Sequence, residues 1–348
     1  MADLSDPQLI AIFAAAAIAT WLAGVRLAKA TDVLDDHFGL GEAIGGMILL
    51  SVVGSLPELA ITVSAASSGH LGLAAGNLIG GVAMQTLVLV VADRFMRGDR
   101  PLSTAASSLV PALEGLLVVA VVGVTVMSAL LPESAAIGSL GVGEIAILAM
   151  WIVGIVLLSK VRNRSDLALP APAGTSAVDP SPQPEPATGE APNIKRTMAI
   201  FGLLALVTLG AGVLLEQTGN QLASNWGISG VLFGATILAA ATALPEISTG
   251  IAGVRMRRYT LVFGDMFGGN AFQLTLFVIA DLVAGQAVLP AESGPNAWIG
   301  VTGLVMTTVF VAGIILRPQR RYAGLGPDSW VVLLVYLLGL WGFVVVSS

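Results

Sequence analysis

Residues 49–93 read LLSVVGSLPELAITVSAASSGHLGLAAGNLIGGVAMQTLVLVVAD, and residues 237–281 read ILAAATALPEISTGIAGVRMRRYTLVFGDMFGGNAFQLTLFVIAD. The two stretches align without a gap at a constant offset of 188 residues. They share an acid, an amide, a proline and paired glycines, so shared hydrophobicity does not account for the match. An internal duplication does, and it predicts a repeat architecture. Numbered in the first copy, the shared residues are Leu50, Leu56, Pro57, Glu58, Leu73, Gly76, Gly80, Gly81, Ala83, Gln85, Val90, Ala92 and Asp93.

The composition of the chain indicates an integral membrane protein. Of its 348 residues 55% are hydrophobic and 11% are charged, and the mean hydropathy is +0.88. A soluble core does not need such values. The absence of cysteine excludes disulfides and thiolate metal ligands. The N-terminus, MADLSDPQ, has no basic residue before the first apolar run, so we expect that run to be a retained helix and not a cleaved signal.

Ten apolar runs are long enough to span about 30 Å of hydrocarbon, at roughly 20 residues each. We therefore expect an all-α membrane protein with ten transmembrane helices. Residues 1–160 would form the first five-helix repeat and residues 196–348 the second. Residues 161–195, rich in Pro, Ala and acid, would be a disordered linker. The expected spans are residues 8–28, 41–67, 71–92, 107–129, 141–160, 197–216, 228–253, 259–284, 296–315 and 329–346.

The basic residues predict how these helices are oriented. All sixteen Lys and Arg residues lie in the odd-numbered connections. By the positive-inside rule those connections, including the linker, are cytoplasmic, and both termini lie outside the plasma (inner) membrane. The loop within the first copy, SSGHLG, then lies outside, whereas VRMRRYT in the second copy lies inside. The two repeats are therefore expected to be inverted, as in many secondary transporters with a site near the midplane.

Each copy places a proline directly before its glutamate. Pro57 and Pro245 remove a backbone donor and clash with the preceding turn, so the second and seventh helices should break there and free carbonyls toward a cavity. An isolated carboxylate at the depth of Glu58 or Glu246 is costly. We expect these acids to bind a cation, to be protonated, or to alternate between the two. Protonated acids that only bond helices are the alternative, which does not explain their recurrence.

Amide, hydroxyl and carboxylate groups near the glutamates are further candidate ligands. Gln85 and Gln273 offer neutral carbonyl oxygens, or alternatively bond their helices to neighbours. Carboxylates with amide, backbone and water oxygens suit Ca²⁺. Asp265 is a third acid near Arg258, and both a cytoplasmic vestibule and a salt bridge remain open for it. The other candidates are Asn77, equivalent to Asp265, and the hydroxyls of Ser51, Ser55 and Thr242, which in apolar helices more often bond their own i−4 carbonyl.

The remaining polar residues are interpreted as structural. His37 and His70 lie in loops and are too isolated for a metal site, and Asp93 and Asp281 are expected to be anchors at helix ends. No Gly-rich phosphate loop, HExxH or GxSxG motif is present, so ATP coupling and hydrolysis have no support, and no enzyme activity or cofactor is expected. The acids expected at the membrane interface are Glu42, Glu114, Glu144 and Glu216.

The two copies resemble the alpha repeats of the calcium/cation antiporter superfamily, which includes sodium/calcium and proton/calcium exchangers. The matching motifs are GSLPE at residues 54–58 with GNLIGG at 76–81, and TALPE at 242–246 with GDMFGGN at 264–270. The resemblance implies that two motif glutamates bind the transported cation and that an amide or acid on the following helix completes the site. These residues map onto Glu58 and Glu246, and onto Gln85 and Gln273.

The resemblance also bears on the counter-ion. Hydroxyls that sodium-coupled members use are depleted here, at Gly54, Gly81, Ala243 and Gly269. Glutamine at the completing position is similar to that of proton-coupled calcium exchangers. Carboxylates that release Ca²⁺ can take up protons instead. We therefore favour H⁺ over Na⁺ as the ion exchanged for Ca²⁺.

Sequence and resemblance together predict a secondary active antiporter that exchanges Ca²⁺ against H⁺ by alternating access. Na⁺ is the alternative counter-ion, and Mn²⁺ or Mg²⁺ the alternative cargo. Its expected partners are inorganic cations and the lipid bilayer, with no nucleotide or nucleic acid, and it is expected to act as a monomer. A cation channel is an alternative of another class, although channels usually repeat around a pore by oligomerisation. A non-transporting scaffold is the third, and predicts that Glu58→Gln and Glu246→Gln change nothing.

Overall fold

The computed structural model describes residues 4–38, 49–106, 108–132, 134–161, 193–289 and 293–347, with Leu167 and Leu169. Its elements are mostly helical. The first half holds α1 (Asp6–Phe38), α2 (Leu50–Gly54), α3 (Leu56–Ser68), α4 (Leu71–Arg94), α5 (Leu102–Ala105), α6 (Val110–Ala129), a hairpin of β1 (Ala136–Ile137) and β2 (Leu140–Gly141), and α7 (Val142–Val161). The second half holds α8 (Ile194–Asn225), α9 (Gly230–Phe233), a π-helix (Gly234–Leu238), α10 (Ala239–Thr242), α11 (Leu244–Arg255), α12 (Tyr259–Gln273), α13 (Leu276–Ala284), α14 (Ser293–Leu316) and α15 (Pro327–Ser347).

The described residues contain eight helices that are long and apolar enough to cross a membrane, or nine if one bent pair counts as a span. This is the architecture of an integral membrane protein. The predicted span over residues 41–67 falls partly on residues 39–48, which lie outside the described residues, as does most of the predicted linker. The rest of that span forms α2 and α3.

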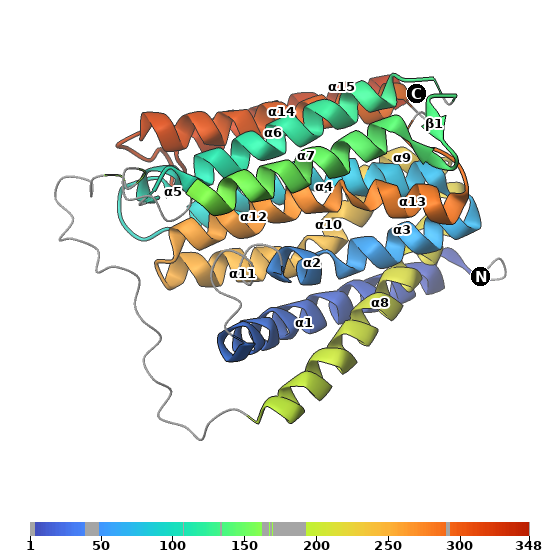
Figure 1. Ribbon diagram of the computed structural model, residues 1–348, viewed down its shortest axis with the longest axis horizontal. Helices are drawn as coiled ribbons and strands as arrows, with labels where there is room; N and C mark the ends of the chain where they lie inside the picture. The colour runs from blue at the N-terminus through green and yellow to red at the C-terminus, as the bar shows by residue number, and fades with distance from the viewer. Residues whose placement is uncertain are drawn as a thin grey trace.

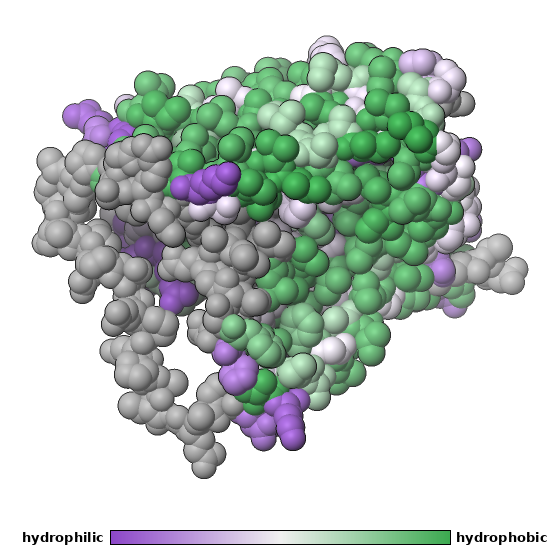
Figure 2. Space-filling view, in the orientation of Figure 1, coloured by the Kyte–Doolittle hydropathy of each residue, from purple (hydrophilic) through white to green (hydrophobic). Residues whose placement is uncertain are grey.

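The repeat helices α4, α12 and α13 form the centre of the molecule. Of the most apolar window of each span, 83% is buried in α4 and 72% in α12–α13, against 22% in α7 and in α8. Helices α6, α7, α14 and α15 cover one side of this centre, and α1 and α8 pack against each other on the other side (Figure 1). On the face shown in Figure 2, apolar side chains cover most of the surface, and most of the hydrophilic ones lie toward its edges. The duplicated stretches are thus surrounded by strongly apolar helices that lie outside the duplication.

Loops that carry cations meet at one end of the bundle. Arg321, after α14, donates to the carbonyl oxygens of Met96 (3.1 Å) and Gly98 (3.0 Å), which follow α4. Arg255, at the end of α11, lies 5.7 Å from the ring centre of Phe95 in the same loop. The start of α1 and the end of α8 are joined separately, where Asn225 donates to Asp6 at 2.6 Å. These contacts group odd-numbered connections together, as the charge pattern predicts.

Both copies interrupt the helix one residue before the Leu-Pro-Glu motif. α2 ends at Gly54 and α3 begins at Leu56, and α10 ends at Thr242 and α11 begins at Leu244. The second pair is bent by 45°. Each proline lies in the first turn of the new helix, where its missing N–H costs no helical hydrogen bond. At the end of α2 the carbonyl oxygen of Val53, four residues before Pro57, accepts a backbone N–H of the helix cap instead.

The repeat glycines let α4 approach the second copy closely. A Cβ atom on Gly76 would lie 2.4 Å from the carbonyl oxygen of Val231, and one on Gly80 would lie 2.3 Å from the Cα of Ala235. Only glycine fits such backbone contacts. Val231 and Ala235 belong to α9 and the π-helix, directly before the break. The first copy's α4 therefore packs directly against the segment that precedes the break in the second copy.

Candidate cation site

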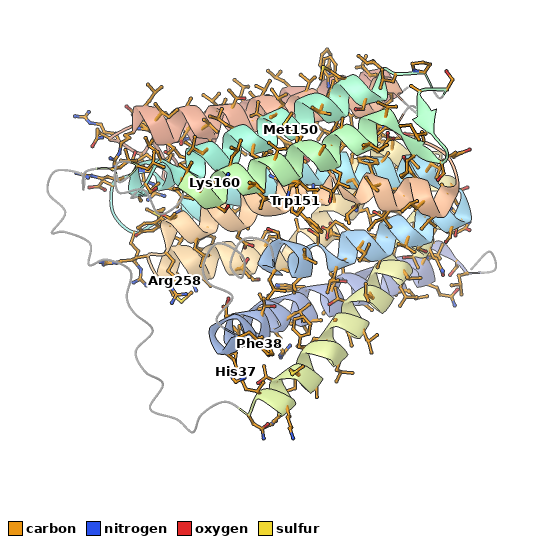
Figure 3. The ribbon with its side chains drawn as sticks, viewed as in Figure 1. His37, Phe38, Met150, Trp151, Lys160 and Arg258 are labelled. Atoms are coloured by element: carbon orange, nitrogen blue, oxygen red, sulfur yellow. The ribbon has the colours of Figure 1, made fainter. Side chains whose placement is uncertain are left out.

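A cavity of about 220 Å³ lies between α1, the α2–α3 break, α11 and α12. Lys29 and Arg258 line it, and Figure 3 shows Arg258 at the same end of the molecule as His37 and Phe38, the last residues of α1. The cavity therefore reaches the end where the cation-bearing loops meet. Its acidic lining residues are Asp32, Glu246 and Asp265, and its hydroxyls come from Thr208, Ser248 and Thr249.

The motif glutamates begin the two short helices that follow the breaks. Glu58 lies in the first turn of α3 and Glu246 in the first turn of α11, where the helix dipole favours negative charge. Glu246 lines the cavity and is 9% exposed; Glu58 is 1% exposed and interacts with the side chain of Thr242. One carboxylate oxygen of each, Oε2, has no hydrogen-bond partner among the described residues. Two buried oxygens are thus open to a proton or a cation.

Asp265 joins the same cavity from α12. Thr249 Oγ1 donates to Asp265 Oδ2 at 3.2 Å, and Asp265 is within Coulombic range of both Glu246 and Asp32. Arg258 also lines the cavity, but no ion pair joins it to Asp265. Of the two interpretations left open by the sequence, this geometry favours the vestibule. Asp265 adds negative charge to the cavity that Glu246 also lines.

The two repeat glutamines meet in the core. Gln85 Nε2 donates to Gln273 Oε1 at 3.1 Å, and Gln273 Nε2 donates to the carbonyl oxygen of Leu78 at 2.9 Å. Both side chains are buried, and neither lines the cavity. The bonds join α4 to the end of α12, so the helix-bonding interpretation of these amides holds in this conformation. Gln85 Oε1 takes part in neither of these two hydrogen bonds.

The remaining candidates are buried near the breaks but differ in their contacts. Thr242 donates to the carbonyl oxygen of Ala239 at 3.2 Å, the local bond expected of a hydroxyl in an apolar helix. Ser55 is 3% exposed and sits between α2 and α3. The amide of Asn77 is fully buried, and neither of its polar atoms has a hydrogen-bond partner among the described residues. Asn77 does not line the cavity, unlike its equivalent Asp265.

No group of three or more His, Asp or Glu side chains in the described part of the chain is close enough to hold a metal ion. A cation at Glu246 would therefore have at most one further carboxylate as a close ligand in this conformation. Neutral oxygens from hydroxyls, backbone and water would supply the rest, which hard cations such as Ca²⁺ accept.

Comparison with known proteins identifies the fold. The sequence model of the family described as "Sodium/calcium exchanger protein" matches residues 8–161 and 196–346. The chain belongs to the sodium/calcium exchanger family. Its two matched segments are the two halves on either side of the predicted linker, so membership covers both repeats.

Two curated relatives match parts of this exchanger-family chain. A protein named "Putative antiporter CaxA" from Alkalimonas amylolytica is 29% identical over 101 residues, which is 29% of this chain and 31% of that protein. "Inner membrane protein YrbG" from Escherichia coli K12 is 26% identical over 145 residues, which is 40% of this chain and 43% of that protein. The chain therefore aligns with less than half the length of each of these relatives.

Solved structures extend the likeness to nearly the whole chain. The sodium-calcium exchanger NCX_Mj has a TM-score of 0.59 at 15% identity, covering 97% of this chain and 99% of its own. Native YfkE has a TM-score of 0.62 at 16% identity, covering 95% and 91%. At such identities the likeness shows that the exchanger fold is shared.

Sequence reasoning missed several residues of the cavity. The residues predicted from the sequence do not include Thr249, Ser248 or Asp32, although all three line the cavity. One signal was present for Thr249: it lies three residues after Glu246, on the same face of α11. Asp32 carries no comparable signal, because α1 is uniformly apolar over most of its length and lies outside the duplicated stretches.

Glu114, Glu144 and Glu216, which are expected near the membrane interface from the sequence, are buried within the protein, at 4%, 2% and 0% exposure. Hydrogen-bond partners on other elements make this burial tolerable for two of them. Glu144 Oε1 accepts from the Leu289 N–H at 3.2 Å, and Glu216 accepts from Ser64 at 2.6 Å and contacts His70 at 2.7 Å. Glu42 lies outside the described residues.

The anchor role predicted for Asp93 and Asp281 is confirmed. Asp93 accepts from the N–H groups of Leu102 (2.8 Å) and Gly326 (2.6 Å) and from Ser329 Oγ (2.7 Å). Asp281 accepts from the N–H groups of Val288 and Gly141, each at 2.9 Å. In both copies this acid therefore ties the end of a repeat helix to the opposite half of the chain.

Proposed function

We propose that this chain is a secondary active antiporter that exchanges Ca²⁺ against H⁺ by alternating access, with Glu58 and Glu246 as the carboxylates that bind the cation. One observation carries the proposal. Two buried carboxylates occupy equivalent places in inverted repeats, and only one of them, Glu246, lines the cavity. An inverted repeat can exchange the conformations of its halves, which would open Glu58 to the other side.

The charge at the site supports an exchange of Ca²⁺ for protons. Glu246 lies within Coulombic range of Glu58, and leaving both ionised in an apolar core without a cation is costly. Ca²⁺ neutralises the pair, and so does protonation of both acids. If Ca²⁺ and protons replace each other at the site, the two carboxylates are never both ionised without a bound cation.

The neutral groups around the glutamates favour H⁺ over Na⁺ as the counter-ion. Thr242 and Thr249 are hydroxyls that remain near the glutamates, and both donate their protons within the protein, to Ala239 and to Asp265. The family's other hydroxyl positions are Gly54, Gly81, Ala243 and Gly269 in this chain. A proton needs only a carboxylate oxygen, whereas Na⁺ needs several oxygen ligands.

The other candidate residues take supporting roles in this proposal. Asp265 would draw cations into the vestibule by its charge. Gln85 and Gln273 would add amide oxygen when the site closes around Ca²⁺, and Ser55, Thr242 and Asn77 would complete it as neighbouring ligands.

We further propose ten membrane spans in an inner (plasma) membrane, with both termini outside and the linker of residues 161–195 inside. The cluster of cation-bearing loops supports this orientation, and with it a cavity that opens to the cytoplasm. Each chain contains both repeats and both motif glutamates, which supports action as a monomer. Residues 1–160 and 196–348 would then be the two inverted domains.

Uptake of ⁴⁵Ca²⁺ into proteoliposomes tests the counter-ion. Vesicles are loaded with acid, with Na⁺ or with K⁺ alone, and diluted into K⁺ medium at pH 8. Uptake driven by trapped acid and lost in Glu58→Gln is the expected result. Uptake that requires trapped Na⁺ would assign sodium/calcium exchange instead, and no uptake in any arm, with Mn²⁺ uptake present, would assign another divalent cation.

A further inference from the structure

Gly81 and Gly269 make a reciprocal contact with the glutamines of the opposite repeats. A Cβ atom on Gly81 would lie 2.8 Å from Gln273 Nε2 and 3.2 Å from Gln273 Oε1. A Cβ atom on Gly269 would lie 3.2 Å from Gln85 Oε1. Gly81 and Gly269 are themselves equivalent, as are the two glutamines. Each glycine thus faces the amide that its own repeat does not carry.

These glycines differ from the neighbouring glycines of the motif. Gly76 and Gly80 contact the backbone of α9 and the π-helix, which is helix packing. For Gly81, by contrast, the three nearest atoms all belong to the amide group of Gln273, and for Gly269 the nearest atom is an amide oxygen. The space that glycine leaves at these two positions is therefore occupied by a functional group and not by a helix backbone.

The amides have little freedom to move away from a larger residue. Gln273 Nε2 is held by the carbonyl oxygen of Leu78 at 2.9 Å, and Gln273 Oε1 is held by Gln85 Nε2 at 3.1 Å. Shifting Gln273 would break at least one of these bonds, and a buried amide without its partner is costly. The same bonds leave Gln85 Oε1 as the one amide oxygen that the pair does not use itself.

We infer that Gly81 and Gly269 are positioning residues that set the orientation of the Gln85–Gln273 amide pair, and through it which amide oxygen is available to the transported cation. The inference rests on the proposed function of these glutamines as ligands. It explains why two glycines recur in the duplication at places where no backbone approaches them. The contact is tighter at Gly81, so this position should be the more sensitive.

A double-mutant cycle in the ⁴⁵Ca²⁺ uptake assay tests the inference. Gly81→Ala is expected to raise the KM for Ca²⁺ roughly tenfold, because small misplacements of a ligand cost about that much or more, with a smaller rise for Gly269→Ala. Shortening the facing amide should relieve the clash. In the matched doubles, Gly81→Ala with Gln273→Asn and Gly269→Ala with Gln85→Asn, KM should lie well below the product of the single effects.

The crossed doubles, Gly81→Ala with Gln85→Asn and Gly269→Ala with Gln273→Asn, are the matched controls and should show clearly weaker coupling. Gly123→Ala, whose Cβ would have ordinary contact at 4.0 Å with Leu304, should leave KM unchanged. Thermal unfolding in detergent separates a folding defect, which lowers the amount of active protein, from a change in KM. If the wild type is active, either of two results overturns the inference but not the proposed function. One is an unchanged KM in Gly81→Ala, and the other is equal coupling in the matched and the crossed doubles. A wild type that transports no cation overturns the proposed function and the inference with it.

Discussion

The carboxylate of Glu246 lies within Coulombic range of Glu58, the residue at the same place in the other copy of the duplication. The two acids are 188 residues apart in the chain and start two separate helices, α3 and α11. Only Glu246 lines the cavity. Each repeat therefore contributes one acid to the pair. In this conformation the cavity reaches the pair through Glu246 only.

Neutralising either glutamate should abolish transport. Glu58→Gln and Glu246→Gln each remove half of the charge that balances Ca²⁺ and leave an amide that cannot exchange a proton, so uptake of ⁴⁵Ca²⁺ should fall about a hundredfold or more. Glu144→Gln is the matched control, since Glu144 is equally buried but bonds the Leu289 N–H, which an amide oxygen can still accept. Retained uptake in both site variants would contradict the cation-binding role of the two glutamates, whereas no uptake by the wild type would favour the non-transporting scaffold.

Asp265 should affect one side of the membrane only. Because it lines the cavity next to Thr249, Asp265→Asn should raise the KM for Ca²⁺ about three- to tenfold in vesicles whose cavity side faces the assay medium, and less in vesicles of the opposite orientation. The effect should weaken as ionic strength rises. Thr249→Val, which removes the hydrogen bond and keeps the charge, serves as control. Equal effects from both sides would place Asp265 in the central site instead of the vestibule.

The bond between Ser64 and Glu216 should be important for stability. Glu216 is fully buried on α8, and its oxygens contact Ser64 at 2.6 Å and His70 at 2.7 Å. Ser64→Ala removes one partner of a buried carboxylate and should lower the free energy of unfolding by about 1–3 kcal/mol. The readout is the thermal unfolding temperature in detergent, with Ser68→Ala, an exposed serine of the same helix, as control. Identical unfolding of the two variants would speak against this role.

The anchors should differ in strength between the repeats. Asp93 accepts three hydrogen bonds and Asp281 accepts two. Asp93→Ala should therefore destabilise the protein by about 3 kcal/mol and Asp281→Ala by about 2 kcal/mol, since each leaves buried donors unpaired. Unfolding temperatures should rank Asp93→Ala below Asp281→Ala, and both below the exposed-loop variant Asp99→Ala. A reversed ranking would contradict the hydrogen-bond count as the source of the difference.

Much of this architecture could be predicted because the duplication repeats the residues that are costly in lipid. A break is expected at Pro57 and Pro245 from the sequence, and separate helices end and begin one residue before each Leu-Pro-Glu motif. Spacing along one helix contains such information. It also identified Asp93 as an anchor at a helix end.

The spacing of residues along one helix does not predict which separate helices touch each other. Gln85 meets Gln273, and Glu216 meets His70, although each pair is far apart in the chain. Equivalent places in two copies do not by themselves mean that two residues touch. The sequence places Glu216 at the end of an apolar run, whereas α8 continues to Asn225 and Glu216 is buried within it. The cavity likewise depends on α1, which lies outside the duplication.

The most direct test of Ca²⁺/H⁺ exchange at the glutamate pair is to follow protons themselves. Proteoliposomes containing a trapped pH-sensitive dye, free of Na⁺ and with the membrane potential clamped by K⁺ and valinomycin, receive external Ca²⁺. We predict internal alkalinisation that tracks Ca²⁺ entry and is absent in Glu58→Gln and Glu246→Gln. Ca²⁺ entry without any proton movement, or entry that occurs only when Na⁺ is trapped inside, would contradict the proposed exchange.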